Sequence, residues 1–112
     1  MNKKEQARKN RRKGRRTENR LNDILGMVRG GLYGGEDGFD EHFSVEIKGR
    51  KTYAGQRFMD QAIKNNKNDK IPIYVVHIVN TKYDNSHVCI RLKDWLKLME
   101  AIDWKKVKRS SK

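Results

Sequence analysis

Apolar and polar positions alternate along this chain with two periods, and each period predicts a different kind of element. Between residues 21 and 28, apolar side chains recur at i, i+3, i+4 and i+7, the spacing of one face of an α-helix. Thr17 is a suitable N-cap for that helix, and the glycines at 30–31 would end it. The same spacing predicts a second helix within residues 55–65 and a last one over residues 95–102.

Strict alternation of apolar and polar side chains over residues 43–48 predicts a β-strand. Successive side chains of a strand point to opposite faces, so Val45 and Ile47 would face a core. Glu46 and Lys48 would then share the other face. This is the clearest strand in the sequence.

Two further strands and one irregular stretch complete the pattern. Residues 71–79 form a nearly unbroken β-branched run, which predicts a strand buried on both faces at the centre of a sheet. Residues 88–92 alternate again and predict another strand. The glycine-rich, acidic residues 30–41 favour tight turns over a long regular element, with room for a short strand at Leu32 and Tyr33.

The order helix, strands, helix, strands, helix predicts an α/β fold. We expect a single small domain with a mixed central β-sheet flanked by helices, because a chain of 112 residues has room for one core. We place this domain at residues 17–103. A basic, flexible arm over residues 1–16 would precede it, and a basic tail over residues 104–112 would follow it.

Positive charge is concentrated at the two ends. The chain has 27 Lys and Arg and 14 Asp and Glu, a formal net charge of +13. Residues 1–16 hold nine basic side chains and one acid, residues 104–112 add five basic and no acidic side chains, and the part between them is neutral. Cationic tails bind polyphosphates by counterion release, so nucleic acid is the expected partner. Docking on anionic lipid is the alternative, but neither tail has an amphipathic apolar face.

The cysteine count and the hydropathy exclude several classes of protein. Cys89 is the single cysteine, so an internal disulfide is excluded and a cytoplasmic setting is expected. No apolar stretch approaches the roughly 20 residues of a membrane span, and no signal-peptide pattern follows the basic N-terminus. The histidines lack zinc spacing. We therefore expect neither a membrane partner nor a small-molecule cofactor.

Three residues carry the candidate chemistry. Glu46 and Lys48 would project from one strand about 6.5 to 7 Å apart. Asp37 lies nine residues before Glu46, beyond a turn, where a neighbouring strand could return its carboxylate. Hydrolysis of a phosphodiester needs a divalent cation, a positioned water and a cation beside the attacked phosphate. Two carboxylates and an amine in this arrangement suit that chemistry.

The order of these residues resembles a known family. Asp37, then eight residues, then Glu46-Ile47-Lys48, with a helix bearing Glu18 before them and one bearing Gln61 after them, resembles the PD-(D/E)xK nuclease superfamily. More narrowly, the chain is similar to the small Holliday-junction resolvases of bacteriophages and their archaeal relatives. The resemblance covers about residues 15–100. It rests on the stretches 34–37, 43–50, 60–62, 73–77 and 90–95.

The resemblance implies a restriction-endonuclease-like α-β-β-β-α-β core and a DNA endonuclease that uses Mg²⁺, with Mn²⁺ as a substitute. It implies that Asp37 and Glu46 bind the metal, with the Ile47 carbonyl as a further ligand. Lys48 would orient the water and stabilise the developing charge. Glu18 would hold metal-bound water, and Gln61 would help to fix Lys48 or the water.

The sequence departs from the family at two positions. Glu36 stands before Asp37 where proline is usual, and Gly38 follows where a β-branched residue is common. Asp40 is therefore a rival for the metal. Gln56 competes in the same way with Gln61.

Other readings of these residues stay open as well. Glu46 and Lys48 can be solvated neighbours on a strand, and the acids near residue 37 can be turn residues. Glu18 can simply complement the dipole at a helix start.

The expected partner is DNA, especially branched DNA such as a four-way junction in a bacterial or phage-infected cell. Cutting two symmetric strands favours a two-fold homodimer. The expected DNA-binding residues are Arg11, Arg12, Lys13, Arg15, Arg16, Arg50, Lys51 and Arg57. Other nuclease substrates, such as mismatches, nicks or ends, and a non-enzymatic basic binding module are the alternatives.

Overall fold

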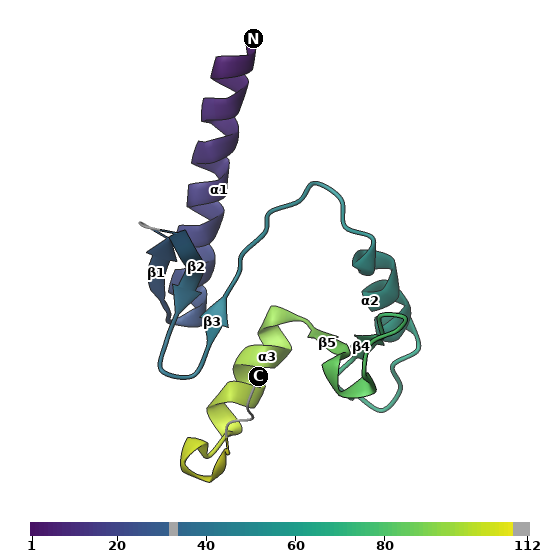
Figure 1. Cartoon of the computed structure of the whole chain (residues 1–112). Helices are drawn as coiled ribbons and strands as arrows, with labels where there is room; N and C mark the ends of the chain where they lie inside the picture. Colours follow the sequence, from purple (N-terminus) through teal and green to yellow (C-terminus); the bar gives the residue numbers. More distant parts are fainter. Residues whose placement is uncertain (32–33, 109–112) are drawn as a thin grey trace. The chain divides into compact units, whose positions relative to one another are not determined.

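The computed structural model describes residues 1–31 and 34–108, and it divides the chain into two units (Figure 1). The first unit is Met1–Lys51 and the second is Thr52–Lys112. The short strand expected at residues 32–33 lies outside the described residues.

Helix α1 (Lys3–Leu25) is much longer than the sequence pattern predicted. It begins beside Asn2, whose side-chain oxygen accepts a hydrogen bond of 2.9 Å from the backbone N–H of Glu5. The arm that we expected to be flexible is therefore helical, because its lysines and arginines, with Gln6 and Ala7, are good helix formers. Thr17 is not an N-cap. Its hydroxyl donates to the carbonyl of Lys13 at 3.0 Å, inside the helix.

The same helix also ends earlier than predicted. Gly26 adopts a left-handed conformation with φ of 70°, and its N–H donates to the carbonyls of Asn22 and Asp23. Glycine takes this conformation without the steric cost of a Cβ, which makes it a common end for a helix. The glycines at 30–31, which we expected to end the helix, belong to the following strand instead.

The first unit contains a three-stranded antiparallel sheet in the order β1-β2-β3. Its strands are β1 (Val28–Gly31), β2 (Gly34–Phe39) and β3 (Ser44–Val45). The expectation of tight turns over residues 30–41, with at most a short strand at residues 32–33, was wrong, because β1 and β2 take up much of this stretch. Two glycines are needed where other groups approach the sheet: a Cβ at Gly30 would overlap the Glu36 carbonyl, and one at Gly38 would overlap the Asn22 side chain.

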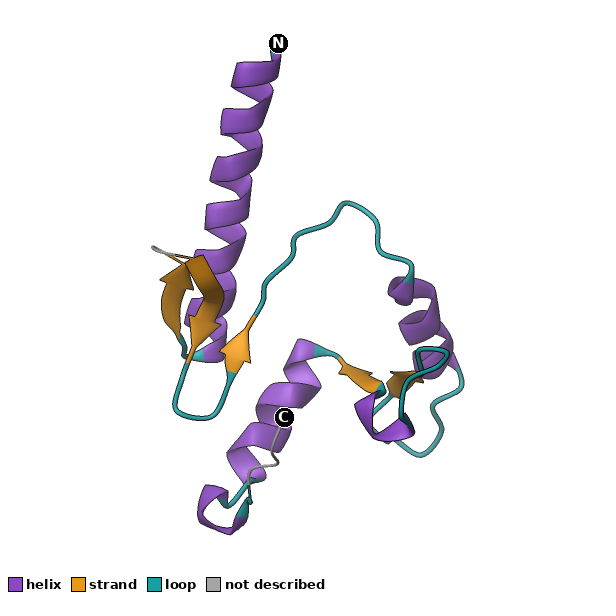
Figure 2. Cartoon of the chain, in the orientation of Figure 1, coloured by secondary structure: helices purple, strands orange, loops and turns teal. Residues whose placement is uncertain are grey.

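The strands of the first unit lie beside the C-terminal part of α1, and the N-terminal part of the helix extends beyond them (Figures 1 and 2). Asn22 is buried, and Leu21 and Leu25 are half-buried. Ile47, just after β3, is buried with 8% of its surface exposed. This small core holds β2 and the following segment against the helix.

The second unit contains two helices and a two-stranded antiparallel ribbon. The order is α2 (Gly55–Lys64), β4 (Ile73–Val76), the 3₁₀ turn η1 (Tyr83–Asn85), β5 (His87–Ile90), α3 (Leu92–Ala101) and the 3₁₀ turn η2 (Trp104–Lys106). Helix α2 packs on β4 through the rings of Phe58 and Tyr74, whose centres are 5.7 Å apart. The predictions of helices near residues 55–65 and 95–102 are confirmed.

Strand β4 differs from the prediction of burial on both faces. Tyr74 and Val76 are half-buried, whereas Ile73 is 46% exposed and Val75 is 58% exposed. Only the face that carries Tyr74 is covered by α2. The β-branched run thus identified the strand correctly but not its environment.

The mixed α/β composition of the chain is confirmed. The sheets differ from the expected single mixed sheet, because the described strands pair antiparallel within each unit. Among the described helices, none is both long and apolar enough to span a bilayer.

Candidate functional site

The segment after β3 keeps the alternation that the sequence predicted, although ladder pairing stops at Val45. Ile47 points into the core, and Glu46 and Lys48 are exposed. Lys48 Nζ lies 2.9 Å from Glu46 Oε1, so the two side chains share one face as predicted. This ion pair is well exposed on both sides, and such pairs add little to stability.

Asp37 reaches this segment from β2. Its Oδ2 accepts a hydrogen bond of 2.7 Å from the backbone N–H of Ile47. The last ladder pairs are Gly38 with Val45 and Phe39 with Ser44, so this bond continues the contact between the two segments beyond the ladder. The Asp37 carboxylate therefore lies beside the peptide bond between Glu46 and Ile47.

Asp40, the rival for the metal, has a different role in the structure. Its Oδ1 accepts hydrogen bonds from the backbone N–H groups of His42 at 2.8 Å and Phe43 at 2.7 Å. The N–H of Asp40 itself donates to the Phe43 carbonyl at 3.0 Å. These bonds are those of a turn between β2 and β3, which matches the interpretation of this acid as a turn residue.

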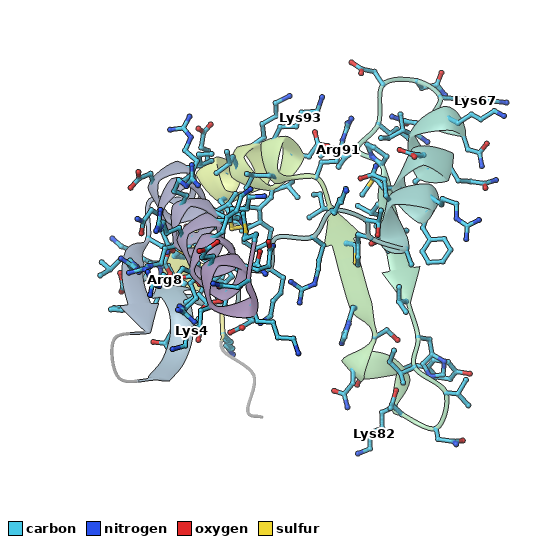
Figure 3. All side chains as sticks on the ribbon, turned by 90° about the horizontal axis from the view of Figure 1, so that it is seen from above. Lys4, Arg8, Lys67, Lys82, Arg91 and Lys93 are labelled. Carbon is cyan, nitrogen blue, oxygen red and sulfur yellow. The ribbon has the colours of Figure 1, made fainter. Side chains whose placement is uncertain are left out.

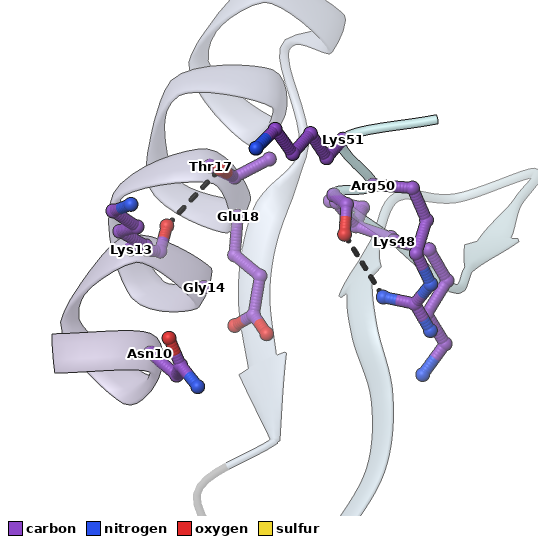
Figure 4. Close-up of a pocket in the computed structure, with 10 residues that line it drawn as sticks. Asn10, Lys13, Gly14, Thr17, Glu18, Lys48, Arg50 and Lys51 are labelled. Atoms are coloured by element: carbon purple, nitrogen blue, oxygen red, sulfur yellow. Dashed lines mark hydrogen bonds between the residues drawn. The ribbon is translucent and has the colours of Figure 1, made fainter. Parts of the chain in front are cut away.

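A groove of about 870 Å³ lies between α1 and the segment 47–51 (Figure 4). Figure 4 shows the Glu18 side chain extending from the helix into the space opposite Lys48 and Arg50. The lining residues are Asn10, Lys13, Gly14, Thr17, Glu18, Ile47, Lys48, Gly49, Arg50 and Lys51. The groove thus brings together two of the predicted catalytic residues, Glu18 and Lys48, with three of the predicted DNA-binding residues.

The charges of the groove favour an anionic ligand. Four of its side chains, those of Lys13, Lys48, Arg50 and Lys51, are cationic, against the one carboxylate of Glu18. Clustered cations facing a concave surface raise the local concentration of phosphate groups. A strand of nucleic acid is a ligand of the right charge for this groove.

The long α1 removes one explanation for Glu18. The helix begins at Lys3, so Glu18 lies in its interior and not in its first turn. The helix dipole acts within the first and last turns. Complementing the dipole therefore does not account for this acid, which lies in the groove wall.

The structure does not gather all the predicted residues in one place. Arg11, Arg12, Arg15 and Arg16 lie on α1 and are exposed, but they do not line the groove. Lys4 and Arg8 also extend from the same helix into solvent (Figure 3). The exposed arginines of α1 therefore form a surface outside the groove, whereas Lys13 of the same helix lines it.

Arg57 and Gln61 belong to α2 in the second unit. There they line a shallow hollow together with Asp60 and Lys64. The competitor Gln56 donates a hydrogen bond of 2.9 Å to Asp60 Oδ1, one turn further along α2. The two glutamines thus differ in setting, and Gln61 is the one that faces the hollow.

Sequence reasoning missed Asn22. This side chain is 2% exposed, and its Nδ2 donates a hydrogen bond of 3.0 Å to the backbone carbonyl of Asp37. The signal was a polar residue between Leu21 and Leu25, one turn after Glu18, on the apolar side of a predicted helix. A polar residue in that position calls for a buried partner.

The donors of this site suit a hard divalent cation. Asp37 offers a carboxylate next to the Ile47 N–H, and Glu46, the preceding residue, offers a second one beside Lys48. In residues 1–31 and 34–108, no three His, Cys, Asp or Glu side chains gather into a metal cluster. Mg²⁺ commonly uses one or two carboxylates and keeps several waters, so two acids and a backbone carbonyl are a sufficient set.

The candidate site lies wholly within the first unit. In its described part, the chain carries no membrane-spanning helix. A comparison of the chain with models of known protein families, with curated proteins and with solved structures found no match.

Proposed function

We propose that this chain is a metal-dependent DNA endonuclease that hydrolyses phosphodiester bonds in branched DNA, with four-way junctions as the preferred substrate. The observation that carries the proposal is the hydrogen bond from Ile47 N–H to the Asp37 carboxylate. Through this bond an acid of β2 contacts the segment that carries Glu46 and Lys48, and Lys48 lines a cationic groove.

Asp37 and Glu46 are the residues that would hold Mg²⁺, or Mn²⁺ in its place, with the Ile47 carbonyl as a further oxygen ligand. The bound cation would polarise a phosphate oxygen and lower the pKa of a water molecule. One oxygen of Asp37 already accepts the Ile47 N–H, which fixes the direction of the carboxylate. Such fixed orientation is what a catalytic group needs, because a poorly placed acid must be reordered at each turnover.

Lys48 is the candidate for the group beside the attacked phosphate. Its ammonium lies 2.9 Å from Glu46, so both groups can act on one phosphate and its attacking water. With Glu46 among the residues that would hold the metal, the Lys48 ammonium would be free to contact a phosphate oxygen of the substrate. Glu18 faces the same groove from α1 and would accept a hydrogen bond from a water there.

The groove and α1 supply the binding surface for DNA. Lys13, Arg50 and Lys51 in the groove would hold phosphates next to the cut, and the exposed arginines of α1 would hold more distant ones. Contacts of this kind give affinity without base sequence, which suits an enzyme that recognises a branched shape. Two symmetric cuts in one junction would need a two-fold homodimer.

The finer fold belongs to the same proposal. The order α1, β1, β2, β3, α2, β4 agrees with the α-β-β-β-α-β core that the family resemblance implies.

A labelled four-way junction incubated with the protein, with and without Mg²⁺, tests the activity. We expect paired nicks near the branch point only with metal, and none in linear duplex of the same sequence. Glu46→Ala should bind the junction with unchanged affinity and leave it intact. Junction binding without any product, in Mg²⁺ or Mn²⁺, would refute the enzyme proposal.

One observation favours a second candidate. The exposed arginines of α1 lie outside the groove, so they can bind nucleic acid whether or not the acids react. A non-enzymatic binding module would bind with the same affinity in the presence and absence of Mg²⁺. A panel of nicked, mismatched and branched substrates then separates a junction enzyme from a nuclease with another DNA target.

A further inference from the structure

Asn22 joins α1 to the strand that carries Asp37. The side chain is 2% exposed, the lowest value among the buried polar residues of the described chain. It lies one helical turn after Glu18, and its Nδ2 donates a 3.0 Å hydrogen bond to the backbone carbonyl of Asp37. The Asp37 residue is therefore held at two points, at its carbonyl by Asn22 and at its carboxylate by Ile47 N–H.

The other end of the Asn22 amide lies against Gly38. A Cβ at position 38 would overlap Asn22 Oδ1, so the amide occupies the space that any other residue would fill. This oxygen is buried and has no hydrogen-bond partner in the described part of the chain. Asn22 and Gly38 thus form one fitted contact, and the unusual glycine after Asp37 has a physical reason.

Packing alone does not explain an asparagine here. Burying an amide oxygen without a partner disfavours folding, and a leucine would fill a similar volume without that cost. The neighbours of Asn22 on the same side of the helix, Leu21 and Leu25, are apolar. What the asparagine adds is the single N–H bond to the Asp37 carbonyl.

From these contacts we infer that Asn22 is a positioning residue for Asp37, acting with Gly38. The amide fixes the rotation of the Asp37–Gly38 peptide, and the fixed peptide keeps the carboxylate directed at Ile47 N–H. Without the amide, the Asp37 carbonyl loses its buried donor, and the carboxylate is less firmly directed at the segment that carries Glu46 and Lys48. This inference rests on the proposed function only for its effect on cleavage, because the geometry itself can be measured without metal or DNA.

The first experiment uses the metal-free full chain and backbone amide NMR. In Asn22→Leu, hydrogen exchange of the Ile47 amide should become at least about tenfold faster, because its acceptor is no longer held in place. The Met27 amide is the internal control, since it donates to the backbone carbonyl of Asn22 at 2.9 Å and does not depend on the side chain. Asn19→Leu, at an exposed position of the same helix, is the matched control variant.

Gly38→Ala tests the same contact from the other side without a change in α1. The new Cβ displaces the Asn22 amide, so Ile47 exchange should rise as it does in Asn22→Leu. Unchanged Ile47 exchange in both variants would overturn the inference. An equal rise at Ile47 and Met27 would also overturn it, because Asn22 would then hold the whole unit together and not Asp37 in particular.

Cleavage of the four-way junction gives the second readout. Asn22→Leu should lower kcat by about tenfold or more and leave the junction Kd unchanged, as expected for a misdirected catalytic group. Asn19→Leu should cut at the rate of the unsubstituted chain. If no form of the protein cuts DNA, the proposed nuclease fails while the Ile47 exchange result still decides the positioning. If the unsubstituted chain cuts DNA and Asn22→Leu cuts equally well, the positioning fails and the nuclease stands.

Discussion

The backbone N–H of Ile47 donates a hydrogen bond of 2.7 Å to Oδ2 of Asp37. Asp37 belongs to β2, and Ile47 lies beyond the last residue of β3, so the bond joins the two segments where the ladder has ended. Ile47 is buried, which holds its peptide in place and makes the N–H a fixed point. The direction of the Asp37 carboxylate is thereby set by the core of the first unit.

Replacing Asp37 and Asp40 by alanine, one at a time, should separate the roles of these two candidate metal ligands. Asp37→Ala should abolish cleavage of a four-way junction while binding persists. Asp40→Ala should keep the activity and lower the unfolding free energy by about 1–2 kcal/mol, because two backbone N–H groups of the β2–β3 turn lose their acceptor. Measuring cleavage and urea unfolding for both variants checks this. Activity that survives Asp37→Ala and disappears in Asp40→Ala would assign the metal to Asp40 instead.

Glu46 should matter for chemistry and hardly at all for stability. The two side chains of its ion pair with Lys48 are similarly exposed, Glu46 at 59% and Lys48 at 61%. Exposed ion pairs contribute about 0–1 kcal/mol to stability. Glu46→Gln should therefore leave the melting temperature nearly unchanged and reduce the cleavage rate by roughly 100-fold or more, as loss of a charged catalytic group does. Glu41→Gln, another exposed acid of the same unit, is the control. Similar cleavage rates for Glu46→Gln and Glu41→Gln would show that Glu46 is only a solvated neighbour of Lys48.

The sequence predicted which side chains of one segment share a face better than it predicted the bounds of the elements around them. Alternation over residues 43–48 was sufficient to put Glu46 and Lys48 on one face, because the period of a strand depends on local backbone geometry alone. The ends of α1 were predicted wrongly at both sides. Asn2 and Gly26 cap the helix, and charged residues between them are good helix formers even without an apolar face.

Long-range contacts were the part that the pattern could not supply. Nothing in the spacing of Asp37 and Asp40 says which acid turns toward Ile47 and which one closes a turn, because that depends on the register of β2 and β3. The burial of Asn22 depends in the same way on Gly38 arriving from another element. The run at residues 71–79 identified β4 but could not show that one of its faces is exposed.

Tyr74 in the second unit should ionise at a higher pH than an ordinary tyrosine. Its hydroxyl lies 3.1 Å from that of Tyr53, and this hydrogen bond, followed by one with Cys89 and by burial, raises the pKa of Tyr74 above the usual 10.0. A phenol that holds its proton more tightly in the folded state stabilises it below about pH 10, and this contribution is lost as the pH rises further. Because the chain has four tyrosines, the difference between the phenolate absorbance titrations of the unsubstituted chain and of Tyr74→Phe measures this residue.

Replacing the partner of Tyr74 checks the cause. Tyr53→Phe removes the largest contribution, so the pKa of Tyr74 should fall toward its ordinary value. Tyr83→Phe is the matched control, since Tyr83 packs against His77 and not against Tyr74. An unchanged Tyr74 titration in Tyr53→Phe would show that Cys89 and burial are the main causes.

Breaking α1 without changing its charge should weaken DNA binding. Ala7→Pro removes a backbone hydrogen bond of the helix and costs about 3 kcal/mol or more of helix stability, while every lysine and arginine of the basic part stays in the chain. If the helix presents these side chains as one surface, junction affinity should fall by roughly three- to tenfold, about 0.7 to 1.4 kcal/mol. Ala7→Ser is the control at the same position.

Gly14→Ala should act in the opposite direction on helicity, because a Cβ there meets only open space and alanine stabilises a helix by about 1 kcal/mol over glycine. Circular dichroism and binding titrations at two salt concentrations measure both effects. Should Ala7→Pro bind with the affinity and the salt dependence of the unsubstituted chain, the arm acts through its charge alone and the helix is not required.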